Sequence, residues 1–336
     1  MIKEFILENC GPLEKIEWQP SPYINLVIGE NSSGKSVLLK MLYTALRATE
    51  EYHRGDDRSN FIEILSDKLH GVFQIDKVGD LVRKGSGRLT FECLIDSQKV
   101  QFSFSPSAVQ NVGEVSKIIN SRADKLSLFL PPKEVLSLTS IIRRSRLQDQ
   151  LLGFDDTYLD LVNALDGEPT KGRVHTNIKD ARDKLSDLID GRLQQSNGSW
   201  KFREGNAQYS IHMTAEGIKR LALIDRLIGN RSLQPGSALF IDEPEAMLHP
   251  KAIVEFMEIL TLLTGQQIQI FMASHSYFVL KALYVIAKRE RLNIQVLSLF
   301  SDIKPQISNL AEEMPDNPII DESINLYEKE LDAELA

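Results

Sequence analysis

The 336-residue sequence predicts an α/β fold with a mostly parallel core sheet, an antiparallel β sub-sheet and a helical insertion. Three observations lead to this prediction. Short apolar segments bounded by Gly, Pro and Asn, which are typical of strands, dominate the first part of the chain. Between residues 133 and 193 the spacing of apolar residues is helical, with breaks at glycines. Beyond residue 238, apolar strands alternate with helical segments, as in proteins built on a parallel sheet.

The N-terminal part is expected to contain three strands, a turn rich in glycine and serine, and a long helix. An antiparallel hairpin that turns at Asp96–Gln98 follows, and Pro131 closes the last strand of this part. The predicted elements are strands at 2–8, 14–18 and 23–28, a helix at about 33–50, a short helix after residue 60, strands at 71–76, 88–95 and 99–105, a helix at 113–122 and a strand at 126–130.

The C-terminal part begins, after the helical insertion, with a second hairpin and a helix. Thr214 is a favourable N-cap for this helix, and Gly217 lies in its first turn, where glycine costs about 1 kcal/mol relative to alanine. That cost raises the question of whether another group approaches this backbone closely. The predicted elements are strands at 199–203 and 207–212, a helix to about 228, a strand at 238–243, a helix at 250–264, a strand at 268–275, a helix at 277–290, a strand at 294–300 and a helix at 320–335 in an acidic tail.

Composition narrows the class of protein. Hydrophobic residues make up 42% and charged residues 26%, as in soluble globular proteins, and no apolar run reaches the roughly 20 residues that span a bilayer. The two cysteines, Cys10 and Cys93, make neither a metal site nor a disulfide framework, so we expect a cytoplasmic protein without a membrane partner. The net charge of −8 argues against binding DNA over the whole surface. A local patch formed by Arg143, Arg144 and Arg146 stays possible.

The segment "GENSSGKS" at 29–36 fits the phosphate-binding pattern G-x-x-x-x-G-K-[ST], and it follows a predicted strand and opens a helix. Backbone N–H groups of such a loop and the helix N-terminus face phosphate oxygens. Lys35 would place a cation on the terminal phosphates, and Ser36 would offer its hydroxyl to Mg²⁺. The residues expected to contact the nucleotide here are Gly29, Asn31, Ser32, Ser33, Gly34, Lys35, Ser36 and Val37.

The segment "ALFIDEPEAMLHP" at 238–250 is an apolar strand that ends in carboxylates. Asp242 is in the position of a Walker B aspartate and would help to hold magnesium, and Glu243 would orient and deprotonate an attacking water. His275, after the next apolar strand, is in a position to contact the terminal phosphate.

Other ligands are less well supported by these residues. His249 with Glu243 and Glu245 does not have the H-E-x-x-H spacing, and no second histidine is near, so a transition-metal site is disfavoured. No Asn-Lys-x-Asp element that would read guanine follows the phosphate loop, which favours ATP.

Together, "IGENSSGKS", "LFIDEPEAMLHP" and "MASHS" resemble the ATP-binding-cassette class of the SMC, RecF and OLD type, and especially compact prokaryotic OLD-like and AbiEii-type abortive-infection ATPases. "LENCGPLEKIEW" and "LFLPPKEVLSL" are similar to further elements of that group. The resemblance implies an ABC-type ATPase head, with Asp242 and Glu243 as the Walker B pair and His275 as the switch histidine. It also implies a homodimer or higher homo-oligomer that sandwiches ATP and Mg²⁺, in which Thr214 and Gly217 of one subunit face the nucleotide on the other.

The same resemblance divides the chain into four parts. These are an N-terminal ATPase lobe at 1–132, the helical insertion at 133–198, a C-terminal ATPase lobe at 199–300 and the acidic tail at 301–336. Gln74 is a candidate for the Q-loop glutamine, with the region around "PPKEV" as the alternative.

Two functions remain open at this point. The first is a nucleotide-dependent dimeric switch that regulates a separately encoded effector, a nuclease or toxin, in anti-phage defence. This choice rests on the roughly 60 residues after His275, too few for the Toprim nuclease domain of OLD proteins. The alternative is a RecF-like DNA repair or recombination ATPase that binds DNA. A transporter subunit is disfavoured, because the segments after the phosphate loop and around Gly217 do not resemble transporter forms.

Overall fold

The computed structural model describes residues 1–52, 60–118, 125–149, 151–168, 176–196, 199–300, 303–315 and 318–335. A six-stranded sheet in the order β14-β13-β3-β12-β11-β7 runs through the molecule, and its first five strands in chain order are parallel, with β14 antiparallel at one edge. This confirms the predicted α/β class with a mostly parallel core sheet. The strands are β3 (Ile24–Gly29), β7 (Leu128–Leu130), β11 (Ala238–Asp242), β12 (Gln269–Ser274), β13 (Gln295–Phe300) and β14 (Ile303–Asn309).

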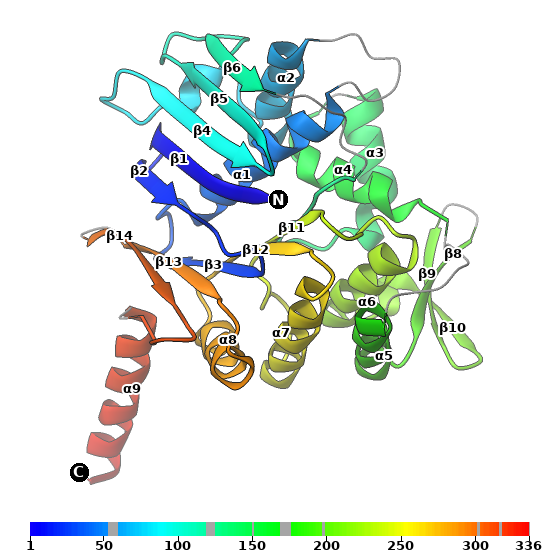
Figure 1. Cartoon of the computed structure of the whole chain (residues 1–336). Helices are drawn as coiled ribbons and strands as arrows, with labels where there is room; N and C mark the ends of the chain where they lie inside the picture. Colours follow the sequence, from blue (N-terminus) through cyan, green and yellow to red (C-terminus); the bar gives the residue numbers. More distant parts are fainter. Residues whose placement is uncertain are drawn as a thin grey trace.

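The central strands β3, β11 and β12 are buried along their whole length, which explains their continuous apolar sequences. Successive side chains alternate between two hydrophobic cores: Leu239 and Ile241 belong to one, and Phe240 to the other. Helices cover one face, and two helices together with a second sheet cover the other (Figure 1).

One core lies between the sheet and the helices that follow β7 in the chain. It includes the helices of the predicted insertion, so these helices pack on the same core as the later ones. The boundaries of the four predicted parts remain a prediction. The helices on this side are α3 (Thr139–Arg143), a π-helical turn at Arg144–Gln148, α4 (Asp156–Leu165), α5 (Thr176–Ile189), α6 (Glu216–Gly229), α7 (Pro250–Thr264) and α8 (Tyr277–Glu290).

The other core lies between the parallel sheet, helix α1 (Lys35–Glu51), helix α2 (Phe61–Phe73) and a five-stranded antiparallel sheet in the order β2-β1-β4-β5-β6. The predicted hairpin is confirmed, with Ile95 opposite Gln98. The strands of this sheet are β1 (Ile2–Cys10), β2 (Leu13–Trp18), β4 (Leu89–Ile95), β5 (Gln98–Phe104) and β6 (Glu114–Ile118).

A small antiparallel sheet and one peripheral helix complete the described chain. The second hairpin is confirmed, although its sheet has a third strand, and the C-terminal helix α9 (Pro318–Leu335) extends away from the body (Figure 1). None of the described helices is both long and apolar enough to cross a bilayer. The sheet consists of β8 (Arg192–Ser196), β9 (Ser199–Glu204) and β10 (Ala207–Ser210), and short 3₁₀ helices occur at Val78–Leu81, Leu136–Leu138 and Ile211–Met213.

Four element predictions are wrong. Residues 71–76 are the end of α2 and the turn after it, because Gln74 caps the helix in a left-handed conformation with φ 51°. Within the predicted helix at 113–122, residues 114–118 form the edge strand β6, and the rest lies outside the described residues. Residues 303–309, assigned to the acidic tail without a predicted strand, pair with β13 as β14. The last residues of the insertion form β8. Each of these short segments takes its conformation from a neighbour that it packs or pairs with, which local propensity does not encode.

Candidate nucleotide site

The phosphate loop lies where the sequence places it, between the end of β3 and the start of α1. Within the described residues no side chain caps the N-terminus of α1, and its first turn contains no acidic residue, so no side chain in this part of the chain occupies its N–H groups. A Cβ atom at Gly29 would lie 2.0 Å from the carbonyl oxygen of Leu299, so the loop can leave the sheet here only as glycine. The loop therefore has the geometry of an anion site at a helix N-terminus.

Lys35 lies over this loop. Its Nζ donates hydrogen bonds to the carbonyl oxygens of Gly29 (2.9 Å) and Glu30 (2.6 Å). Burial lowers the pKa of Lys35, and the nearby carboxylates of Asp242 and Glu243 oppose this change. The cation is thus held at the loop by the backbone and by negative charge from the end of β11.

Asp242 is 6% exposed at the carboxyl end of β11, and its neighbour across the sheet is Ala273 of β12. Burial raises the pKa of Asp242, and a hydrogen bond from the hydroxyl of Ser36 acts in the opposite direction. The structure therefore brings together Ser36 and Asp242, two residues far apart in sequence. A hydroxyl beside a carboxylate is the donor set that holds Mg²⁺ on a nucleotide, so these residues fit that ion.

The chain turns sharply after β11. Glu243 still pairs with β12 through its N–H, which donates to the carbonyl of Ala273 at 2.9 Å, but its φ of 51° is left-handed. Such a conformation is uncommon outside glycine and occurs preferentially at functional sites. Met247, in the same turn, has φ 63° and is 76% exposed.

Glu245 contacts the end of β12. Its Oε1 accepts hydrogen bonds from the hydroxyl of Ser274 (2.9 Å) and from the N–H of His275 (3.3 Å). Spacing in the sequence carries no signal for these contacts, because the partners are 29 and 30 residues away. His249 caps α7 by accepting from the N–H of Lys251, which gives this histidine a structural role.

The backbone of Gly217 is closely approached by the turn after β11. A Cβ at Gly217 would lie 2.7 Å from the carbonyl oxygen of Met247 and 3.1 Å from Cδ2 of Leu248. A backbone does approach closely, and it is that of the same chain, in the turn after β11. The N-cap prediction is wrong: Ala215 is the N-cap of α6, and the hydroxyl of Thr214 is buried without a partner among the described residues.

Sequence reasoning missed Arg220, one turn after Gly217. Its guanidinium donates to the carbonyl oxygen of Asp242 at 2.9 Å and to those of Pro131 and Pro132 at 3.4 and 3.3 Å. Burial lowers the pKa of Arg220 to about 10. Arg220 thereby links α6 to the end of β11 and to the segment after β7.

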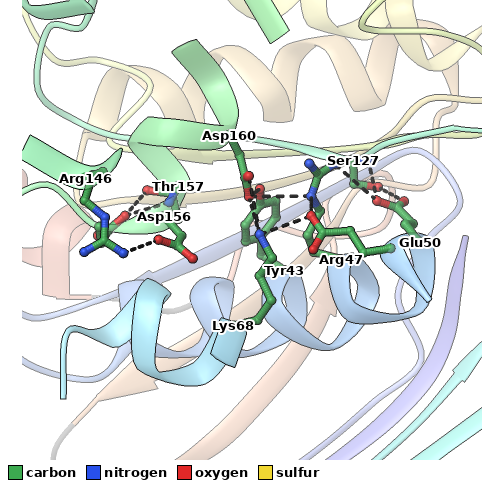
Figure 2. Close-up of polar contacts among 11 residues, drawn as sticks. Tyr43, Arg47, Glu50, Lys68, Ser127, Arg146, Asp156, Thr157 and Asp160 are labelled. Carbon is green, nitrogen blue, oxygen red and sulfur yellow. Dashed lines mark hydrogen bonds and ion pairs between the residues drawn. The ribbon is translucent and has the colours of Figure 1, made fainter. Parts of the chain in front are cut away.

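A buried polar network joins α1, α2 and α4 beside the site (Figure 2). Asp160 of α4 accepts a hydrogen bond from the hydroxyl of Tyr43 (2.7 Å) and pairs with Lys68 (3.2 Å) and Arg47 (3.5 Å). Burial alone would raise the pKa of Asp160, but these two cations lower it. The carboxylate is therefore charged and paired, which is the condition for tolerating a buried charge.

A second ion pair connects the same helices closer to the phosphate loop. Lys40, one turn after Ser36, lies 2.6 Å from a carboxylate oxygen of Asp155, which caps the N-terminus of α4. Through this pair, the helix that begins at the phosphate loop contacts the region predicted as an insertion.

Two other sequence candidates have different surroundings. Gln74, the Q-loop candidate, accepts a hydrogen bond from the N–H of Gly153 at 3.2 Å. The three arginines considered for DNA each pair with an aspartate of the same chain, which reduces the positive charge that they present. The pairs are Arg143–Asp166, Arg144–Asp149 and Arg146–Asp156.

Comparisons with known proteins agree with this geometry. A family model described as "AAA domain, putative AbiEii toxin, Type IV TA system" matches residues 24–281, which is more than half of the chain. Among curated proteins, none matches by sequence. The solved SMC head bound to the C-winged helix domain of ScpA is similar, with a TM-score of 0.56 at 15% identity, over 93% of this chain and 98% of that one. An SMC head with an extended coiled coil, bound to the C-terminal domain of ScpA derived from Pyrococcus furiosus, has a TM-score of 0.53 at 12% identity over 98% of both chains. The chain therefore belongs to the AbiEii-type AAA family and has the fold of SMC head ATPase domains.

Proposed function

We propose that the chain binds ATP at the phosphate loop and hydrolyses it. The observation that carries this proposal is that Lys35, Ser36 and Asp242 lie together at the carboxyl ends of the parallel strands. Glu243 directly follows Asp242. Glu243 would accept a proton from the water that attacks the terminal phosphate, and His275 would contact that phosphate. Ser36 and Asp242 would hold Mg²⁺, which supplies neutralisation of phosphate charge.

The proposal includes a dimer in which α6 of one subunit completes the site of the other. Met213 and Met247, which flank the start of α6 and the turn that it contacts, are 78% and 76% exposed. Exposed large apolar side chains on both of these segments support a surface that a partner covers. The hydroxyl of Thr214 is buried and has no partner in the described part of its own chain, so contact with the neighbouring subunit's nucleotide requires this side chain to turn outward.

The biological role that we propose is a nucleotide-dependent switch for a separately encoded nuclease or toxin in anti-phage defence. The family description, which names a "putative AbiEii toxin" of a Type IV TA system, supports a role in a toxin–antitoxin context. The RecF-like alternative is less well supported, because each arginine of the predicted DNA patch pairs with an aspartate.

A first experiment measures ATP hydrolysis and size in solution. Wild type is expected to release phosphate from ATP with Mg²⁺, and Lys35→Ala to lose this activity. Glu243→Gln is expected to form a stable dimer with ATP, because it retains the nucleotide contacts but lacks the base. Size-exclusion chromatography with light scattering gives the mass. A Glu243→Gln variant that stays monomeric at saturating ATP would refute the sandwich, whereas absence of hydrolysis in wild type would refute the ATPase.

A second experiment tests whether sites are shared. Lys35→Ala and Thr214→Ala are expected to be inactive or slow alone. In a mixed dimer, one site combines an intact phosphate loop with an intact Thr214, so mixing the two variants should restore activity. Mixing each variant with itself at the same total concentration is the control. Failure to complement would place Thr214 outside the partner's site.

A further inference from the structure

The turn between β11 and α7 carries two glutamates in different surroundings. Glu243 is partly exposed and pairs with β12 through its backbone. The side chain of Glu245 is only 12% exposed, and its Oε1 already accepts two hydrogen bonds. The side chain of Glu245 is therefore engaged in hydrogen bonds with the end of β12, whereas Glu243 contacts β12 through its backbone. This suits Glu245 to holding the local structure and leaves the carboxylate of Glu243 for the attacking water.

The contacts of Glu245 fix the short connection that carries His275 from β12 to α8. The hydroxyl of Ser274 donates to Glu245 and accepts from the N–H of Ser276 at 3.0 Å, while the N–H of His275 donates to the same glutamate oxygen. The imidazole Nδ1 of His275 lies 3.7 Å from that oxygen, and the ring is 53% exposed. One carboxylate thus holds the backbone of His275 while the ring stays accessible.

The other side of the same turn is attached to α6. Arg220 donates to the carbonyl of Asp242, where the turn begins, and the carbonyl of Met247 lies against Gly217, where the turn ends. The turn at residues 243–247 consequently lies between α6 and His275 and contacts both.

We propose that Glu245 is a positioning residue that holds His275 in place through Ser274 and the His275 N–H. Through it, the turn at 243–247 connects α6 to His275 within one subunit. This inference rests on the proposed ATP hydrolysis and on contact of His275 with the terminal phosphate. Glu245 acts on His275 by accepting hydrogen bonds, and its carboxylate also offsets the burial of the Arg220 guanidinium.

The test compares steady-state ATP hydrolysis of variants. Glu245→Ala is expected to lower kcat by about 10- to 100-fold, because displacement of a site group by about 1 Å has effects of this size. The KM for ATP should change by no more than about twofold, since the hydrogen bonds of Glu245 are with the end of β12. Glu245→Gln keeps an acceptor oxygen and should retain kcat within about threefold. Glu255→Ala, which removes a more exposed carboxylate from α7, is the matched control.

A double-mutant cycle with His275→Ala decides between positioning and an independent role. If Glu245 acts through His275, the double variant Glu245→Ala/His275→Ala should be no slower than His275→Ala alone. Multiplied effects, or a normal kcat in Glu245→Ala, would overturn the inference. A wild type without hydrolysis, or a His275→Ala variant as fast as wild type, would instead remove its premise in the proposed function.

Ser274→Ala keeps the inference testable if Glu245→Ala does not fold. It deletes only one hydroxyl, and it should lower kcat several-fold in an otherwise intact chain. This effect should also disappear in the His275→Ala background. A Ser274→Ala variant with normal kcat would contradict the arrangement in which Ser274 transmits the contact.

Discussion

At the scale of single residues, the site depends on places where the backbone of one segment touches another. Gly217 is the clearest case, because the carbonyl of Met247 occupies the space that a side chain would need. The turn that Met247 closes also contains Glu243 and Glu245. A helix residue therefore controls the position of carboxylates that are more than twenty residues away in the sequence.

Gly217→Ala is expected to lower ATP hydrolysis by at least about tenfold and to leave ATP affinity within about twofold. The added Cβ must push Met247 away, and it does not touch the phosphate loop. Steady-state kinetics and calorimetric nucleotide titration measure the two quantities. Gly87→Ala, where no atom lies within 4 Å of the new Cβ, is the matched control.

Mixing two variants in one dimer distinguishes the contact of Gly217 with Met247 inside one subunit from a contact across the dimer. Gly217→Ala should fail to restore activity to Lys35→Ala, because the displaced turn belongs to the same subunit as the intact phosphate loop. Thr214→Ala should succeed in the same experiment. Full complementation by Gly217→Ala would show that the contact with Met247 is unimportant for turnover.

At the scale of elements, α1 is held by buried polar contacts along its whole length. Beyond the network around Asp160, its last turn contributes Glu50, whose carboxylate accepts from the N–H (2.7 Å) and hydroxyl (2.6 Å) of Ser127, next to β7 (Figure 2). Burial raises the pKa of Glu50 to about 7. The helix that starts at the phosphate loop is thus attached to α4 and to the residue that precedes β7.

The raised pKa of Glu50 predicts a pH-dependent stability. The folded state binds this proton more tightly than the unfolded state, whose pKa is near the ordinary value, so stability from Glu50 is lost as pH rises through about 7. Between pH 5.5 and 8 wild type should lose about 2 kcal/mol more unfolding free energy than Glu50→Gln, which cannot titrate. Urea unfolding at both pH values measures this, with Glu328→Gln on the exposed helix α9 as the control. Equal losses in wild type and Glu50→Gln would contradict a buried titrating carboxyl.

At the scale of the whole molecule, the described chain contains only one copy of each part of the site. The phosphate loop and the end of β11 lie together, whereas the hydroxyl of Thr214 has no partner in the described residues. A second copy that docks with its Thr214 over this loop would complete two sites at once and would cover the exposed methionines. Such a closed two-fold arrangement is the commonest symmetry of homo-oligomers.

Met213→Asp is expected to weaken the ATP-bound dimer of the Glu243→Gln variant by at least about tenfold in Kd, because it places a charge in an apolar contact. Affinity for ATP should not change, which nucleotide titration checks, while sedimentation velocity gives the dimer Kd. Leu326→Asp on α9, at a side chain 66% exposed, is the matched control. A dimer as stable as the parent would place the interface elsewhere.

The α/β class, the loop at 29–36 and the acidic end of β11 could be predicted from the sequence alone. Each of these is encoded by neighbouring residues: a loop of glycines before Lys35, or a run of apolar residues before Asp242. The folded structure was needed to find that Gly217 faces Met247, that Glu245 accepts from the N–H of His275 and that Arg220 binds the carbonyl of Asp242. It also decided that residues 114–118 and 303–309 are edge strands. The physical reason is the same in each case, since such contacts depend on which distant segment packs against a residue, and local spacing and propensity carry no record of that partner.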